Sequence, residues 1–348
     1  MQTLKPSLLV MMLLAACDGN PFVEEPDGGT DGGGGGVTSD FPLTGTTTNP
    51  TRGKAIQRVE NQDSVSGNGF AQDFEYDADN DTFLVDNLAF DGENVYTRDI
   101  GFNASPPDAP GTLPGSDVSI FKGDQIVRDS DGEIVDQFAY RALYGTSTSG
   151  QTEFAIVRTG SYIPYGFGGF VYQRNGGVTL PSSGQAHFEG DYSAIRDFNG
   201  PDTIVGGIEY VTGQMVVDID FDDFNDAGAT RGDGVKGYVY DREVFDINGN
   251  NVTGEIIAAL NGDTGTANEL PVLVFEVGPY AMTNAGEVTA GINSVSDGEL
   301  YEDGTYYAVI SGDDAGEIVG IIVVESQDPR EGMEAVTVRE TGGFIVYN

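Results

Sequence analysis

The residues that catalysis uses most often are scarce in this chain. His187 is the only histidine, and it lies between Ala186 and Phe188 in a stretch typical of a strand. A serine hydrolase would need this histidine as its base, but the sequence contains no Gly-x-Ser-x-Gly motif. Ser119 and Lys122 have the Ser-x-x-Lys spacing of β-lactamases, yet they stand in a strand-like segment and no Lys-Thr-Gly follows. The sequence therefore favours binding over catalysis, although carboxylate pairs alone can hydrolyse glycosides.

One acidic turn has the spacing of a calcium loop. Asp77, Asp79 and Asp81 place oxygen ligands at alternate positions, as the first half of an EF-hand loop does. Thr82 and Leu88 stand where that loop requires glycine and glutamate. A calcium site at these three aspartates and a solvated hairpin turn are therefore both open.

Four aromatic residues gather within nine positions of the chain: Tyr162, Tyr165, Phe167 and Phe170. In a pocket, such side chains suit an apolar or planar ligand. The alternative is that they pack the junction between two domains. The glycine-rich stretches are not followed by Lys-Ser or Lys-Thr, so no phosphate loop is expected and no cofactor is expected.

The N-terminal residues have the pattern of an export signal. Lys5 is followed by an apolar run and then by Leu-Ala-Ala-Cys at 14–17, and the run is too short to span a bilayer. This pattern resembles the bacterial lipobox, which implies removal of residues 1–16 and acylation of Cys17. Cys17 is the only cysteine, so no disulfide is expected. We expect an anchor in the lipid bilayer of the outer membrane. The inner membrane is the alternative, because Asp18 resembles the retention signal of enteric bacteria.

The charge of the chain limits its partners. Its 348 residues include 56 Asp and Glu against 16 Lys and Arg, a formal net charge of −40. Such a surface repels nucleic acid and anionic lipid headgroups, so neither is an expected partner. The acids are scattered rather than blocked, which favours solubility in salty water. Binding of a basic partner or of divalent cations is the alternative.

The composition predicts an all-β protein with a flexible N-terminal segment. The chain has 51 glycines, 19 Phe and 16 Tyr, and stretches with a helical period are almost absent. Residues 17–52 are rich in Gly, Pro and Thr and read as a tether. We expect a smaller β-sheet domain at 53–175 and a β-barrel at 176–348.

The C-terminal half shows the alternation of half-buried strands. Met215 and Val217 fall on one face of a strand, and Asp218 and Asp220 fall on the other, which is not the apolar outer band of a membrane barrel. A short helix is expected at 253–262. Eight antiparallel strands can close into a filled barrel, and we expect them near 184–194, 203–211, 213–222, 235–247, 271–278, 304–311, 316–325 and 335–347.

Several of these segments together resemble a known family. The motifs are Gly-Gln-Ala-His-Phe-Glu-Gly-Asp-Tyr at 184–192, the strand at 213–221, Gly-Thr-Tyr-Tyr-Ala at 304–308, Asp-Ala-Gly-Glu-Ile-Val-Gly at 314–320, and Glu-Thr-Gly-Gly-Phe at 340–344. They resemble the β-barrel domain of transferrin-binding protein B and related bacterial surface lipoproteins. The resemblance covers about half of the chain. It implies a lipid-anchored binding or surface lipoprotein with a small β "handle" domain ahead of the barrel.

These observations predict a non-enzymatic binding module at the cell envelope. Its partner would be an envelope protein or a small ligand, and its role would be in nutrient or metal acquisition. The alternative is a structural or envelope-decorating surface lipoprotein with no small-molecule ligand. We expect the binding surface on the barrel loops and on the aromatic segment at 162–170.

Overall fold

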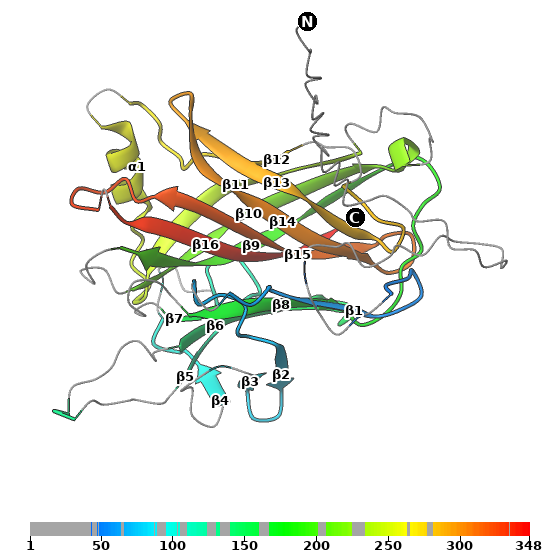
Figure 1. Ribbon diagram of the computed structural model, residues 1–348, viewed down its shortest axis with the longest axis horizontal. Helices are drawn as coiled ribbons and strands as arrows, with labels where there is room; N and C mark the ends of the chain where they lie inside the picture. Colours follow the sequence, from blue (N-terminus) through cyan, green and yellow to red (C-terminus); the bar gives the residue numbers. More distant parts are fainter. Residues whose placement is uncertain are drawn as a thin grey trace, which may run out of the picture.

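The protein consists of an eight-stranded sheet that lies against a closed barrel (Figure 1). The computed structural model describes residues 43, 47 and 49–348, except for 64–65, 87, 89–94, 103, 105–109, 124–129, 133–139, 160–166, 201–206, 225–233, 263–264, 277–280 and 334. The predicted all-β fold class is confirmed. In the described part of the chain, no helix is both long enough and apolar enough to cross a membrane.

The N-terminal unit is an antiparallel sheet in the order β1-β8-β7-β6-β5-β4-β3-β2. Strands β2 to β8 form a meander, and β1 pairs with β8 at one edge. In β7, Phe154 and Ile156 alternate with Ala155 and Val157, and all four are buried because both faces of the sheet are covered. The strands are β1 (Ile56–Val59), β2 (Asp73–Asp77), β3 (Thr82–Asp86), β4 (Val95–Arg98), β5 (Ser119–Gly123), β6 (Tyr140–Thr146), β7 (Thr152–Thr159) and β8 (Gly168–Arg174).

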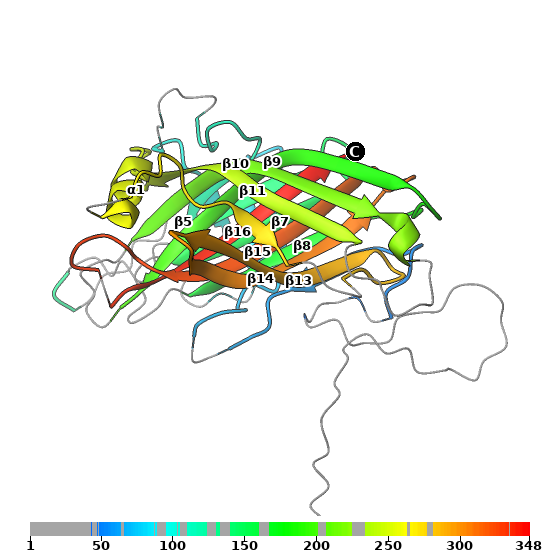
Figure 2. The same cartoon turned by 90° about the horizontal axis from the view of Figure 1, so that it is seen from above.

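The C-terminal unit is a barrel of eight antiparallel strands, which is closed by pairing of its first and last strands (Figure 2). Met215, Val217 and Ile219 point into its core, whereas Asp218 is exposed, as the alternation predicts. The strands are β9 (Gln185–Asn199), β10 (Ile208–Asp220), β11 (Val235–Asp246), β12 (Leu273–Phe275), β13 (Glu287–Ser296), β14 (Glu299–Ser311), β15 (Glu317–Gln327) and β16 (Thr337–Tyr347). The expected helix is present as α1 (Thr253–Asn261), and a 3₁₀ helix, η3 (Phe221–Phe224), follows β10.

The number of barrel strands is as predicted, but two of the expected boundaries are wrong. The segments expected near 203–211 and 213–222 belong to one strand, β10, because the chain continues through Gly213 with a register shift against β11. The barrel therefore contains one strand that the sequence did not predict, β13. Its Gly291, Asn293 and Ser294 are residues typical of turns, but here they pair with β14.

One face of the sheet packs on the barrel wall, and we call this interface the seam. In Figure 1, strands β6 to β8 lie directly beneath β15, β16 and β9. The seam is a continuous apolar core because side chains of both units are excluded from water there. Its buried members include Leu143, Phe154, Ile156, Phe170 and Tyr172 from the sheet, and Ile195, Tyr210, Val309, Val319 and Ile321 from the barrel.

The other face of the sheet is covered by its own N-terminal strands. The ring centroids of Phe83 and Phe121 lie 5.5 Å apart, and those of Tyr76 and Tyr144 lie 5.1 Å apart. These contacts fold the β2–β3 hairpin over β5 and β6, so that a third core forms on the side away from the barrel.

Two consecutive glycines allow β16 to be packed tightly from both sides. A Cβ atom at Gly342 would overlap the ring of Tyr192 inside the barrel, and one at Gly343 would overlap the ring of Phe154 in the seam. The Phe154 ring also covers Gly145 of β6. Gly342 and Gly343 therefore allow close packing, because an aromatic ring lies directly against each face of β16 at these two positions.

Candidate functional site: a cavity in the seam

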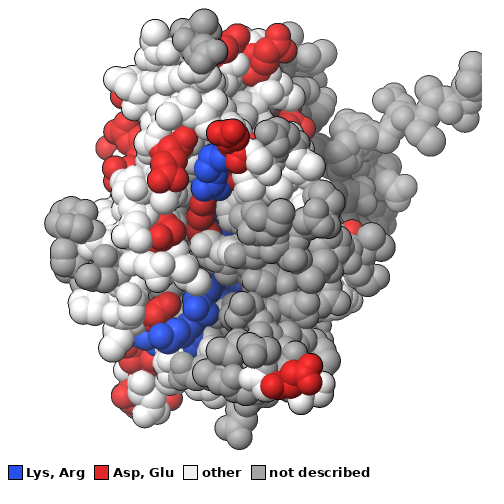
Figure 3. Space-filling model, turned by 90° about the vertical axis from the view of Figure 1, so that its left-hand side faces the viewer, with Lys and Arg blue, Asp and Glu red and all other residues white. Residues whose placement is uncertain are grey.

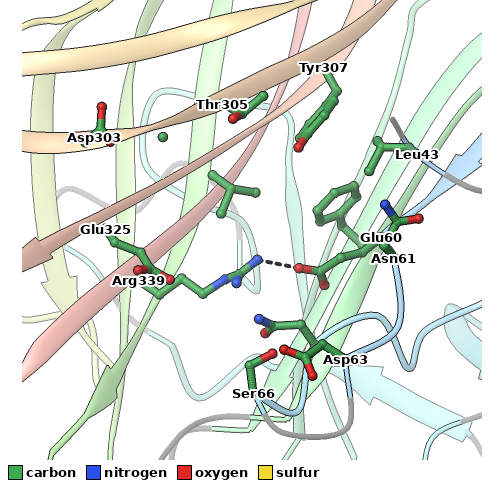
Figure 4. Close-up of a pocket in the computed structure, with 14 residues that line it drawn as sticks. Leu43, Glu60, Asn61, Asp63, Ser66, Asp303, Thr305, Tyr307, Glu325 and Arg339 are labelled. Atoms are coloured by element: carbon green, nitrogen blue, oxygen red, sulfur yellow. Dashed lines mark hydrogen bonds and ion pairs between the residues drawn. The ribbon is translucent and has the colours of Figure 1, made fainter. Parts of the chain in front are cut away.

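A cavity of about 360 Å³ lies in the seam between the two units. Glu60, which follows β1, lies on one side, and Tyr307, Glu325 and Arg339 of β14, β15 and β16 lie on the other (Figure 4). Arg339 forms an ion pair with Glu60 across the cavity. The second carboxylate oxygen of Glu60 accepts a hydrogen bond from the backbone N–H of Gly69 at 3.0 Å. The cavity therefore has walls from both units, joined by one ion pair.

The lining of the cavity is mixed in character. Apolar surface comes from Phe170 and Val323, and the ring centroid of Phe170 lies 6.2 Å from that of Tyr307. Carboxylates come from Asp303 and Glu325 on neighbouring barrel strands. Burial raises the pKa of Tyr307, so its hydroxyl is uncharged at neutral pH. Such a lining has both apolar surface and polar groups that can orient a ligand.

Two further ion pairs cross the seam and are almost fully buried. Arg158 Nε donates to Asp197 Oδ2 at 2.5 Å, and Arg58 Nε donates to Glu287 Oε1 at 2.6 Å. Burial alone would lower the pKa of Arg158, but Asp197 and other nearby carboxylates raise it above its ordinary value. Both arginines lie in the sheet and both carboxylates lie in the barrel, so these pairs fix how the two units sit on each other.

Arg174 joins the two units without a direct ion pair. Its Nη1 donates to the carbonyls of Ala285 at 3.0 Å and of Ile310 at 2.5 Å, both on the barrel side. Its Nη2 donates to the carbonyls of Thr51 and Lys54 at 3.1 Å each. Burial lowers the pKa of Arg174 to about 10, which keeps it charged at neutral pH.

The barrel interior holds its own network of charges. Arg242 Nη2 donates to Glu302 at 2.6 Å, and its Nη1 donates to Glu340 at 3.2 Å. The Tyr192 hydroxyl donates to Glu340 at 2.8 Å. Burial alone would raise the pKa of Glu302, but Arg242 lowers it below its ordinary value. Because most of these buried charges are paired with one another, the network reads as part of the barrel core rather than as a binding site.

Most of the described arginines are committed to internal ion pairs of this kind. On the end of the molecule shown in Figure 3, acidic side chains spread over the surface, and the few basic ones lie near the middle of the face. The outer carboxylates are therefore left with few cations around them. The arginines paired with carboxylates are Arg58, Arg98, Arg141, Arg158, Arg196, Arg242, Arg330 and Arg339.

The predicted aromatic segment contributes one residue to the cavity. Phe170 is buried in the seam and lines the cavity wall. Phe167 stacks on Phe70, with ring centroids 4.2 Å apart, in the core on the opposite face of the sheet. Tyr162 and Tyr165 lie outside the described residues. A ligand role for these aromatic residues stays a prediction.

Two of the three carboxylates of the turn considered for calcium, those of Asp77 and Asp81, already have hydrogen-bond donors. Asp77 accepts bonds from the backbone N–H groups of Asp79 and Asn80 at 2.9 and 3.2 Å, and from the Asn80 side chain at 2.6 Å. Asp81 accepts two bonds of 2.7 Å from Arg98. In the part of the chain that the structure describes, no group of three or more His, Cys, Asp or Glu side chains is arranged to hold a metal ion. A calcium site at this turn gains no support from this geometry.

His187 lies on the outer wall of the barrel, with its side chain 55% exposed. Its Nδ1 lies 2.6 Å from an oxygen of Asp218, and its Nε2 lies 3.0 Å from an oxygen of Glu189. Hydrogen bonds to Asp218, which has the larger effect, and to Glu189 raise the pKa of His187 above its ordinary value. The predicted lipidation site, Cys17, lies outside the described residues and stays a prediction.

The cavity residues of the barrel were not identified from the sequence. Tyr307, Glu325 and Arg339 alternate with residues that point into the barrel, so the period of two could place them on its outer wall. Nothing in that pattern shows that Glu60, 279 positions before Arg339, would face them. Leu43, within the expected tether, is also buried and lines the cavity.

Comparison with known proteins gives structural matches of low identity. No family and no curated protein matches the sequence. Transferrin-binding protein B from Haemophilus parasuis Hp5 matches at 10% identity and a TM-score of 0.35, over 85% of this chain and 45% of that chain. The isotype 1 protein from serogroup B Neisseria meningitidis matches at 11% and 0.33, over 84% and 43%. A solved surface lipoprotein matches at 11% and 0.27, over 58% and 79%. This chain spans less than half the length of these two transferrin-binding protein B chains, which belong to the family that its C-terminal motifs resemble.

Proposed function

We propose that this chain is an exported, lipid-anchored protein of the bacterial envelope whose folded part binds a small ligand in the seam cavity. The observation that carries the proposal is a cavity of about 360 Å³ with walls from two separate units. Small-molecule sites typically fall between roughly 300 and 1,000 Å³ and lie at such junctions. The cavity is therefore of a size to hold one small molecule.

Binding without chemical conversion is supported by the residue types at the cavity. Among its described lining residues there is no histidine, cysteine or lysine. His187, the only histidine, lies on the outer barrel wall with both ring nitrogens against carboxylates. The carboxylates of Asp63, Asp303 and Glu325 are the groups at the cavity that are left for acid–base chemistry. Turnover of a bound ligand that is lost in Glu325→Gln would overturn the non-enzymatic part of the proposal.

The envelope location rests on the sequence. The signal pattern ends at Cys17, and the polar, glycine-rich sequence that follows it would connect a lipid to the folded part. A cavity carried on such a tether would capture solutes close to a membrane without entering it. This arrangement fits a role in nutrient acquisition.

The test is a thermal-shift screen of small molecules on the purified mature chain. A variant that fills the cavity, Thr305→Trp, and a matched variant at an exposed site, Thr266→Trp, should be screened with it. We expect a ligand that raises the melting temperature of the natural chain and of Thr266→Trp but not that of Thr305→Trp. A ligand whose effect survives in Thr305→Trp binds elsewhere, and that result would reject the seam cavity as the site.

A second candidate function, docking of an envelope protein, is favoured by a different surface. Tyr238 lies opposite Val274, and Val295 lies opposite Leu300, in the registers of β11–β12 and β13–β14. Among the described residues, these four apolar side chains are all more than a third exposed on the outer wall of the barrel. Because the chain has a formal net charge of −40, the partner would present lysines or arginines around an apolar centre.

Co-purification from envelope extracts tests this docking surface. Val274→Asp combined with Leu300→Asp should abolish capture of a partner that the natural chain retains. Ile100→Asp, which changes an exposed apolar residue of the sheet unit, should leave capture unchanged. Equal capture by all three proteins would exclude the barrel wall as the docking surface.

A further inference from the structure

Two carboxylates that line the cavity come from directly opposite positions of neighbouring strands, and neither has an ion-pair partner among the described residues. Asp303 of β14 and Glu325 of β15 are direct cross-strand neighbours on the outer wall of the barrel. Both are exposed, and neither forms an ion pair or a hydrogen bond with any other described side chain. Like charges in this position repel each other and destabilise the sheet. A positive charge placed between them would remove that repulsion.

The nearby arginines do not supply this charge. Arg339 is the next residue in the same cross-strand row, opposite Glu325, but its guanidinium is paired with Glu60. The guanidinium of Arg158 is bonded to Asp197 and to Oδ1 of Asn68, which lines the cavity. Glu325 contributes to the raised pKa of Arg158 without touching it. The row therefore keeps an excess of negative charge at the cavity.

The remainder of the cavity is suited to an apolar group. Phe170 and Tyr307 place their rings near each other, and the side chains of Val323 and Leu43 complete an apolar wall. Ser66 adds a hydroxyl oxygen that is excluded from solvent and has no hydrogen-bond partner among the described residues. An unsatisfied buried hydroxyl is costly, so a ligand that bonds it would gain affinity.

These features distinguish between classes of ligand. An inorganic cation is best held by several converging side-chain ligands, and the described part of the chain contains no group of three or more His, Cys, Asp or Glu side chains arranged to hold one. An anion would meet the carboxylates of Asp63, Asp303 and Glu325, whereas the guanidinium groups of Arg339 and Arg158 are already paired with Glu60 and Asp197. A molecule with both a cationic and an apolar part satisfies the carboxylates and the rings together.

We propose that the seam cavity binds a small organic cation, with an ammonium or amidinium group between Asp303 and Glu325 and an apolar group against Phe170 and Tyr307. This inference rests on the proposed function, since it names the ligand class of the same cavity. The ligand's positive charge would restore balance to the row of charges on the barrel wall. The apolar part of the ligand would move out of water and into contact with the rings of Phe170 and Tyr307.

The test compares three probes of similar shape and different charge. 2-Phenylethylamine is cationic, 2-phenylethanol is neutral and 3-phenylpropionate is anionic, and binding of each is measured by calorimetry at low ionic strength. We expect the amine to bind at least about tenfold more tightly than the alcohol, since one good charge-assisted contact is worth about that factor. Added salt should weaken binding of the amine, because both carboxylates are exposed and salt screens their charge.

Two double variants separate the cavity from the overall charge. Asp303→Asn with Glu325→Gln should weaken binding of the amine about tenfold or more and leave the alcohol unchanged. Asp313→Asn with Glu255→Gln makes the same change in net charge at exposed positions outside the cavity and should have no effect. The cavity variant should be at least as thermally stable as the natural chain, because it removes a repulsion. An equal loss of affinity in both variants would overturn the inference, since only bulk charge would then matter.

The remaining outcomes separate this inference from the proposed function. If the alcohol binds as tightly as the amine and Thr305→Trp blocks both, the cavity binds ligands and the choice of an organic cation is wrong. If calcium chloride alone raises the melting temperature of the natural chain but not of the cavity variant, the carboxylates hold an inorganic cation and the inference fails. If neither the probes nor any screened compound binds, both this inference and the proposed function fail.

Discussion

Replacing Arg158 with methionine tests whether buried charge holds the sheet on the barrel. The side chains of Arg158 and Asp197 are only 2% and 3% exposed, and the distance between Nε and Oδ2 is 2.5 Å. The variant leaves Asp197 in the seam without its counter-charge, and Asn68 loses a donor at 2.8 Å. Breaking a buried pair from one side costs about 3–5 kcal/mol. That is a large share of the roughly 5–15 kcal/mol that keeps a typical protein folded.

Equilibrium unfolding in urea measures this cost. The chain has no tryptophan, so unfolding is followed by circular dichroism and by tyrosine fluorescence. Arg98→Met is the matched control, because the Arg98–Asp81 pair is partly exposed, at 21% and 44%, and should contribute on the order of 1 kcal/mol. Arg158→Met combined with Asp197→Asn should recover much of the loss, since no unpaired charge then remains buried.

The result that would refute this reasoning is specific. If Arg158→Met and Arg98→Met lower the free energy of unfolding equally, burial adds nothing to the pair. If the double variant is as unstable as Arg158→Met, the loss comes from packing of the long side chain and not from the charge left behind.

Three further predictions concern the closing strand, the histidine and the anchor. Gly343→Ala should cost about 1–3 kcal/mol in urea unfolding through overpacking, whereas Gly254→Ala, with open space around it in α1, should be neutral or stabilising; equal effects would refute the packing argument. The single imidazole signal in a proton NMR titration should show a pKa above 6.5 for His187, which Asp218→Asn should lower. The stability that this raised pKa contributes is fully present below pH 6.5 and is lost as the pH rises through the pKa of His187 in the folded protein. An unchanged titration of His187 in Asp218→Asn would contradict the role of Asp218. Cys17→Ser should abolish incorporation of radiolabelled palmitate and release the protein from membranes; palmitate retained by the variant would exclude Cys17 as the site.

The regular parts of the fold were predictable because strands carry their own period. Met215 and Val217 alternate with polar residues, and the structure buries them as expected. The segment at 153–158 is likewise rich in apolar and β-branched residues, and it lies in the strand β7. The alternation depends only on neighbours along the chain, so a single sequence displays it.

The strand β13 and the seam cavity were not predictable for different reasons. Gly291, Asn293 and Ser294 have low strand propensity, and their pairing with β14 and β12 overrides it. The cavity depends on which outer residues of the barrel meet the sheet. Glu60 and Arg339 are brought together only by the docking of two complete units, which no local pattern records.

The glycine pair of β16 has a consequence for the order in which the protein can be completed. Gly343 forms the seat of the Phe154 ring, and β16 also pairs with β9 to close the barrel. β16 follows every other strand in the chain, so neither the barrel nor the docking of the N-terminal sheet can be finished until it has been made. Contacts so distant along the chain form slowly. During synthesis, neither the barrel nor its interface with the sheet can therefore become fully packed until β16 has been made.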